Sequence, residues 1–322
     1  MKSLKFATVA LVSAVAVGVA FGDIGRAIAE DFPGGQTINL ISWSAAGSPK
    51  DVMAREVAKS LKKQLGWRVA VMDITGGSGA AAMHYLLNQP ANGLTLIAAS
   101  GSMELALQTN LKSMFGLKDF DFVSEIQTDP FVMVVKADSP FKTMADLEAK
   151  GRKGPVSVAG FGADSDEHLV AADLAKQHNF AITWIPYSGG SKAITAVLGG
   201  NVEAVLTNLS QTVPLVEGGK LRIIGATTAQ PIDNPAAPSF ASMGYKNMVR
   251  SLWRGFIAKA GASKAQIEAL SKAFEKLPND PDYVKYTKRV HITIKYLGPE
   301  EFRKSVEASM KGSASELSLL GH

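Results

Sequence analysis

The fold class follows from one segment, residues 37–73, which reads TINLISWSAAGSPKDVMAREVAKSLKKQLGWRVAVMD. The apolar, β-branched runs at its two ends, Thr37–Ser42 and Arg68–Asp73, predict strands. Residues 51–65 predict a helix, because apolar residues recur there at helical spacing, namely Val52, Val57, Ala58 and Leu61. A strand, a helix and a second strand in this order indicate a right-handed βαβ unit on a parallel sheet.

The alternation of strands and helices continues in two series. The first adds a helix at residues 80–88, a strand at 95–99, and an extended segment at 122–135 interrupted at Asp129-Pro130. The second predicts strands at 156–159, 182–185, 202–206, 221–227 and 252–259, with helices at 168–178 and 192–198. Three helices, at 264–277, 280–289 and 299–311, are expected to return and cover the first series.

We therefore expect an α/β protein of two lobes, each a mainly parallel sheet flanked by helices. The first lobe is predicted to comprise residues 30–128 plus 252–322, and the second residues 129–251. Two hinge crossovers, near residues 128–131 and 251–254, would join them.

The N-terminus predicts a secretory leader. Lys2 and Lys5 precede an apolar run over residues 6–21, and Ala27-Ile28-Ala29 supplies a small-x-small cleavage step. The run is shorter than the roughly 20 residues that a membrane-spanning helix needs, although an uncleaved anchor is the alternative. We expect a signal peptide over residues 1–29, cleavage near Ala29, and a mature protein in the periplasm.

The composition argues against nucleic-acid partners and excludes cysteine chemistry. Removing Lys2, Lys5, Arg26 and Asp23 changes 34 basic and 29 acidic residues to 31 and 28, a net charge of about +3. So small an excess, without a basic run, argues against a nucleic-acid surface. The absence of cysteine from the sequence excludes disulfides, thiolate catalysis and cysteine-ligated metals.

Two loops of the first lobe follow predicted strands and open predicted helices, where ligands bind in open α/β sheets. Residues 43–51 (WSAAGSPKD) are small, and free N–H groups at the helix start could hold a carboxylate. A tight turn without a ligand is the alternative. Residues 77–82 (GSGAAA) match the dinucleotide pattern G-x-G-x-x-A, but the next strand ends in Ser100 without an acidic residue. These glycines are therefore better suited to an anion nest than to a dinucleotide cofactor.

The second lobe has two comparable loops. Residues 160–168 (GFGADSDEH) contain possible helix caps; a metal site at Asp166, Glu167 and His168 is disfavoured, because adjacent residues do not share a helix face. Residues 186–191 (PYSGGS) open another helix, and Asn208 follows a strand close behind. Tyr187 is either a wall of the site or a core residue.

The sequence lacks the common catalytic signatures. It contains no G-x-S-x-G, H-E-x-x-H or P-loop pattern, and the five histidines share no spacing. A Ser/His/Asp triad assembled in space stays open, since such triads need no sequence proximity. We predict no catalytic residue, no metal and no cofactor.

Several segments match one known family in order along the mature chain. The pattern P-F-x-x-G-G-x-x-D-x-x-A-R corresponds to WSAAGSPKDVMAR at residues 43–55, with Ser48 in place of the second glycine and Trp43 in place of the proline. Further matches are VMDITGGSG (71–79), ANGLTL (91–96), PFKT (140–143), IPYSGGSKAITAVLGGNVEAVLTNLS (185–210) and WRGF (253–256). The chain thus resembles the substrate-binding proteins of tripartite tricarboxylate transporters, the Bug family.

The resemblance implies a two-lobed, type II-like periplasmic binding protein that closes on an organic acid and delivers it to a membrane permease. It implies that the loops at Gly47 and Gly76 bind one carboxylate mainly through main-chain N–H groups and bridging water, and that the other lobe selects the distal part. By our own argument from the free N–H groups at a helix start, no arginine is needed. The expected ligand-binding residues are Trp43, Ser44, Ala46, Gly47, Ser48, Asp51, Thr75, Gly76, Gly77, Ser78, Ser100, Gly162, Ala163, Asp164, Ser165, His168, Tyr187, Ser188, Gly189 and Asn208.

The ligand class is only partly constrained. Lys50 and Lys192 are the nearest cations in these loops, which argues against a highly charged ligand, and Trp43, Phe161 and Tyr187 would suit an aromatic acid. We expect a monomer. Two alternatives stay open: a ligand sensor that docks onto a membrane kinase, and an exported hydrolase that uses Ser48 or Ser78.

Overall fold

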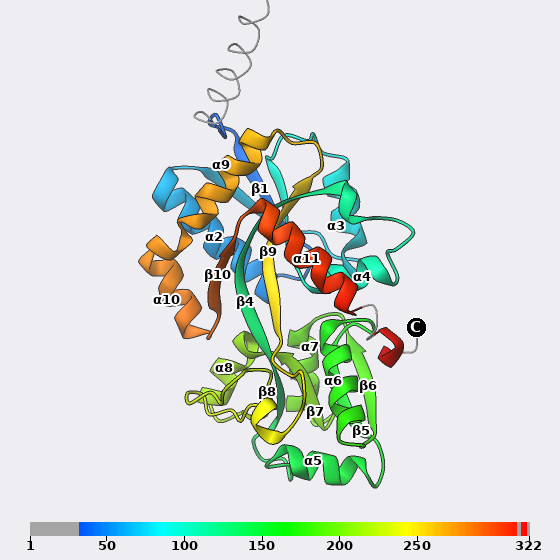
Figure 1. Ribbon diagram of the computed structural model, residues 1–322. Helices are drawn as coiled ribbons and strands as arrows, with labels where there is room; N and C mark the ends of the chain where they lie inside the picture. The colour runs from blue at the N-terminus through cyan, green and yellow to red at the C-terminus, as the bar shows by residue number, and fades with distance from the viewer. Residues whose placement is uncertain (1–31, 314–316, 321–322) are drawn as a thin grey trace, which may run out of the picture.

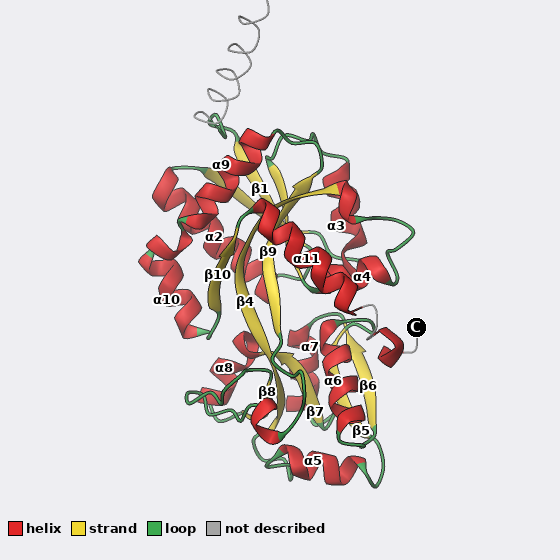
Figure 2. Cartoon of the chain, viewed as in Figure 1, coloured by secondary structure: helices red, strands yellow, loops and turns green. Residues whose placement is uncertain are grey.

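The computed structural model describes residues 32–313 and 317–320 and consists of two lobes stacked end to end (Figure 1). The expected leader, residues 1–29, lies outside the described residues. Both lobes are layered α/β units, with strands in the middle and helices on both faces (Figure 2).

The sheet of the upper lobe in Figure 1 has the order β2-β1-β3-β9-β4-β10. Its strands are β1 (Thr37–Ser42), β2 (Arg68–Asp73), β3 (Thr95–Ser100), β4 (Phe120–Lys136), β9 (Ser251–Lys259) and β10 (Thr293–Leu297). The first three are parallel to one another, whereas β9, β4 and β10 each run antiparallel to the preceding strand in this order.

Two hydrophobic cores fix the helices of this lobe. On one face α2 (Pro49–Leu65), α9 (Lys264–Glu275) and α10 (Pro281–Arg289) bury Met53, Phe274 and Tyr283. On the other, α3 (Ala80–Leu87), α4 (Ser102–Gln108) and α11 (Pro299–Ser313) bury Met83, Met103 and Phe302. The three C-terminal helices therefore cover the first lobe, as expected.

The lower lobe has the strand order β6-β5-β7-β4-β8. Its strands are β5 (Val156–Phe161), β6 (Ile182–Tyr187), β7 (Ala204–Asn208) and β8 (Leu221–Ala226), together with the second half of β4. The helices α5 (Met144–Gly151) and α6 (Asp166–Gln177) pack on one face, and α7 (Gly190–Leu198) and α8 (Leu209–Glu217) on the other. Short 3-10 turns lie at Gly77–Gly79, Leu117–Asp119, Ala241–Met243, Leu277–Asn279 and, against α6, Leu317–Leu320.

One strand, β4, belongs to both sheets. Residues 120–130 pair with β9, whereas Phe131 and the residues after it pair with β7 and β8. The expected interruption at Asp129-Pro130 is therefore wrong: the strand is continuous. Pro130 is tolerated because it lies where the pairing partner changes, so its missing N–H costs little.

The two-lobed α/β class is confirmed, with one difference in the sheets. They are mixed rather than mainly parallel, because β4 and β9 run antiparallel to the neighbouring strands of the three-stranded parallel sets. Four elements had no sequence prediction: α4, α5, α8 and β10.

Candidate ligand-binding cleft

A cavity of about 650 Å³ lies between the lobes. Its walls come from the loops β1–α2 and β2–α3 of the upper lobe and from β5–α6, β6–α7 and the end of β7 of the lower lobe. Thirteen of the predicted residues line it: Trp43, Ser44, Ala46, Ser48, Thr75, Gly76, Gly77, Ser78, Gly162, Tyr187, Ser188, Gly189 and Asn208. The structure thus brings the four loops predicted from the sequence into one cleft.

The β1–α2 loop is shaped by its own side chains. Ser48 caps α2, its Oγ accepting a hydrogen bond from Asp51 N at 3.3 Å. The Asp51 carboxylate accepts from Gly47 N at 2.8 Å and pairs with Arg55 at 2.7 Å. Asp51 therefore organises the loop and does not line the cavity, and the Gly47 amide is already engaged.

The β2–α3 loop presents its main chain to the cavity. Gly76, Gly77, Ser78 and Gly79 all have positive φ, between 55° and 135°. Glycine is required at position 79, where a Cβ would lie 2.5 Å from the Trp43 ring. The side chains that would cover the backbone are absent or small, so the exposed main chain at residues 76–78 faces the cleft.

The β5–α6 loop is held by an aromatic stack outside the cavity. The His168 ring stacks on Trp184 with centroids 4.8 Å apart, and Trp184 Nε1 donates to Gly162 O at 2.7 Å. Ser165 caps α6 by accepting from His168 N at 3.1 Å. His168 and Ser165 thus support the loop, while Ala163 and Asp164 line a small side cavity of about 80 Å³.

Two other predicted residues lie away from the main cavity. Ser100 is fully buried at the end of β3. Gly47 lines a neighbouring cavity of about 440 Å³, formed by α2 and α10 on one side and α7 and α8 on the other. Pro49, Ser191 and Gln211 line both of these larger cavities.

Charged side chains also line the cavity: Lys50 and Lys192, the two cations expected near these loops, and Glu167 and Arg254, which were not expected there. Lys50 lies at the start of α2, only 7% exposed, with Nζ 5.0 Å from the centroid of the Trp43 ring and 5.7 Å from that of Phe161. Burial, and secondarily the charge of Arg254, lowers the pKa of Lys50 to about 7, while Glu167 and Asp166 oppose the shift.

Two acids face these cations from the first turn of α6. Glu167 lines the cavity, is 4% exposed, and has its pKa raised to about 7 by burial and by the neighbouring Asp166. Burial also raises the pKa of Asp166 to about 6, against a hydrogen bond from Ser102 and the charge of Lys50. The sequence places Asp164, Ser165 and His168 of this loop in the site and disfavours a metal at Asp166, Glu167 and His168, but it does not predict a ligand-binding role for either of these two acids.

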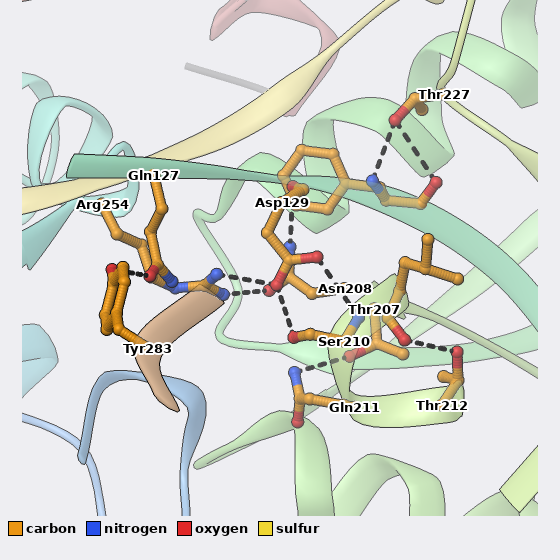
Figure 3. Close-up of polar contacts among 12 residues, drawn as sticks. Gln127, Asp129, Thr207, Asn208, Ser210, Gln211, Thr212, Thr227, Arg254 and Tyr283 are labelled. Atoms are coloured by element: carbon orange, nitrogen blue, oxygen red, sulfur yellow. Dashed lines mark hydrogen bonds and ion pairs between the residues drawn. The ribbon is translucent and has the colours of Figure 1, made fainter. Parts of the chain in front are cut away.

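Arg254 of β9 forms the floor of the cavity and is fixed by a polar network at the junction of the lobes (Figure 3). Its guanidinium donates to Asp129 of β4 at 2.7 Å and to Asn208 at 3.0 Å. Asp129 also accepts from Ser210 N at 3.2 Å and Ser210 Oγ at 2.5 Å. An arginine that the sequence analysis did not place at the site therefore lines the cavity, and its charge is paired with Asp129.

The described residues contain no group of three or more His, Asp or Glu side chains placed to hold a metal ion. No helix among them is long and apolar enough to cross a membrane. What the geometry offers is a polar cleft between two lobes, with exposed main chain on one wall and buried charges of both signs.

A two-lobed fold with a cleft between the lobes is compatible with a solute-binding protein, but the fold alone does not assign that role. Residues 53–312 match the family model described as tripartite tricarboxylate transporter family receptor. The chain belongs to this family, so it is a substrate-binding protein and not an enzyme. The hydrolase alternative is thereby excluded, and the Ser48 hydroxyl is in any case used as a helix cap.

Relatives agree with this assignment. Protein BugT of Bordetella pertussis is 28% identical over 268 residues, covering 81% of this chain and 82% of that protein. A UPF0065 protein of Cupriavidus necator is 26% identical over 299 residues, covering 92% and 90%. The solved structure of R. palustris Rpa4515 with adipate has a TM-score of 0.82 at 22% identity, covering 88% of this chain and 97% of that chain, and shows the common fold.

Proposed function

We propose that the cleft binds a small organic carboxylate. The observation that carries this is the run of positive φ values at residues 76–79, which exposes main chain to the cavity beside the N-termini of α2 and α3. Successive N–H groups in such turns, with the positive ends of helix dipoles, favour an anion. The adipate bound by the related Rpa4515 supports the same ligand class.

Binding is proposed to close the lobes on each other. The moving bodies would be residues 30–128 plus 252–322 and residues 129–251, with the hinge where β4 and β9 pass between them. Because the cavity walls come from both lobes, closure would remove the ligand from water and add the contacts of the second lobe.

Delivery to the membrane subunits of a tripartite permease completes the proposal. The mature protein would be a periplasmic monomer released by cleavage near Ala29. Co-purification of the full-length chain with the permease subunits is the expected result, and co-purification with a membrane kinase instead would favour a sensor.

Isothermal titration of the mature protein against mono-, di-, tri- and aromatic carboxylates tests the ligand class. Saturable binding of at least one compound is expected, together with a smaller radius of gyration by X-ray scattering in its presence. Absence of binding across the whole panel would contradict the proposal.

A further inference from the structure

We propose that the ligand carries an ammonium group as well as its carboxylate, and that Lys50 and Glu167 recognise these two groups from opposite lobes. This inference rests on the proposed carboxylate-binding function and specifies its ligand class. It follows from three features of the cavity: an unsatisfied acid, an unpaired cation and the sum of the buried charges.

Glu167 supplies the unsatisfied acid. Its carboxylate lines the cavity from α6, and its Oε2 atom is buried without a hydrogen-bond partner among the described residues. A buried carboxylate oxygen without a donor is costly, and a charged donor satisfies it best. A ligand ammonium in the cavity would supply such a donor.

Lys50 supplies the cation on the facing wall. Its ammonium lies 5.0 Å from the centroid of the Trp43 ring and 5.7 Å from that of Phe161, and it forms no ion pair with Glu167 or any other described acid. The rings favour the charged ammonium at the cavity but do not neutralise it. A ligand carboxylate would complete this site.

The charge balance favours a zwitterion over a dianion. Lys50 and Arg254 contribute two positive charges, while Asp129, Asp166 and Glu167 contribute three negative ones, a sum of −1 when all five are ionised. Lys192, the further cation along the cavity, is exposed, so water screens it. A dicarboxylate would bring two more negative charges next to Asp166 and Glu167, whereas an amino acid brings an ammonium to them.

Titration calorimetry with matched pairs tests this inference. The pairs are L-glutamate and glutarate, L-aspartate and succinate, and 4-(aminomethyl)benzoate and 4-methylbenzoate. In at least one pair the amino compound should bind about tenfold tighter or more than its partner. If the unsubstituted acid binds as tightly as its amino counterpart in every pair, the inference is wrong while carboxylate binding stands. If no compound binds, the proposed function itself fails.

Two variants separate recognition from a structural role. Glu167→Gln should weaken the amino compound about tenfold or more and leave its partner unchanged or bound more tightly, and Glu167→Asp, which keeps the charge, should retain the preference. Lys50→Met should weaken both members, since both have the carboxylate. The controls are Glu217→Gln and Lys62→Met, exposed residues of α8 and α2 outside the cavity. Equal weakening of both members by Glu167→Gln would overturn the role of Glu167.

Discussion

The Lys50 ammonium lies near two aromatic rings, Trp43 and Phe161, and the residue is almost entirely buried. Its lowered pKa means that the folded protein binds the proton less tightly than the unfolded chain does. Between the folded value of about 7 and the ordinary value of 10.5, the unfolded state therefore carries more protons. The resulting destabilisation is complete below pH 7 and declines as the pH rises to 10.5.

Lys50→Met should consequently stabilise the ligand-free protein, with a gain in the free energy of unfolding that is largest near pH 6 and shrinks towards pH 10. Urea denaturation at pH 6, 8 and 9.5 measures this dependence. Lys62→Met on the same helix should show no such trend. A gain that is independent of pH, or a loss, would disagree with the burial of a charged amine.

Gly79 is the position where the backbone requires glycine most strongly, since φ is 101° and a Cβ would overlap the Trp43 ring. Gly79→Ala should lower the free energy of unfolding by about 2–4 kcal/mol, from strain and the steric clash together. Gly154→Ala is the matched control, because a Cβ there meets no atom within 4 Å, and should change stability by less than about 0.5 kcal/mol.

At the scale of single residues, the sequence predicted the small residues of the cleft and its two lysines, Lys50 and Lys192, but not its acid Glu167 or its arginine Arg254. Gly76, Ser78 and Tyr187 could be found because glycine-rich turns after strands mark ligand loops. Glu167 and Arg254 could not, because their inward direction depends on how α6 and β9 pack, and local sequence does not record that packing. The direction of the His168 side chain could not be predicted either: it was expected in the site, and it stacks on Trp184 instead.

Among the elements, β4 and β9 determine how the lobes are joined. Their pairing extends from Phe120 with Lys259 to Pro130 with Ser251. The ion pair between Asp129 and Arg254 lies near the end of this pairing, and both of its side chains are buried. Loss of one partner would leave a buried charge without its counter-ion. Removing one partner of a buried ion pair lowers the free energy of unfolding by more than the intact pair contributes to it.

Asp129→Asn should lower the free energy of unfolding by about 3–5 kcal/mol, and addition of Arg254→Met should restore part of it. The urea midpoints of the single and double variants give the coupling. Asp138→Asn removes an exposed pair with Lys136 and should leave the midpoint nearly unchanged. Additive losses in the double variant would show that the two side chains do not act as a pair.

Helices and strands with strong periodicity were predictable, and four weaker elements were not. Pro214 inside α8 and the seven-residue length of α4 remove the signals on which such predictions depend. Pro130 had the opposite effect, since it suggested a break in a strand that is continuous. The mixed sheets could not be predicted either. The chain passes from one lobe to the other along β4 and β9, and these two strands therefore enter their sheets in the direction opposite to the parallel strands beside them.

For the whole molecule, the shared strand predicts that the two lobes unfold together. Scanning calorimetry should give one transition, with a calorimetric to van't Hoff enthalpy ratio of about one. Neither lobe can lose its sheet while the other retains all of β4. Two resolved transitions would show that each half of β4 is stable on its own.

The division of the cavity between lobes also bears on how cargo leaves the protein. Lys50 belongs to one lobe and Glu167 to the other. Opening of the lobes would therefore separate the two contacts, and a zwitterionic ligand could keep only one of them at a time. A permease that binds both lobes and pulls them apart would then empty the carrier without competing for its contacts. Under these proposals, release would depend on the separation of the lobes, and capture could stay tight without making release slow.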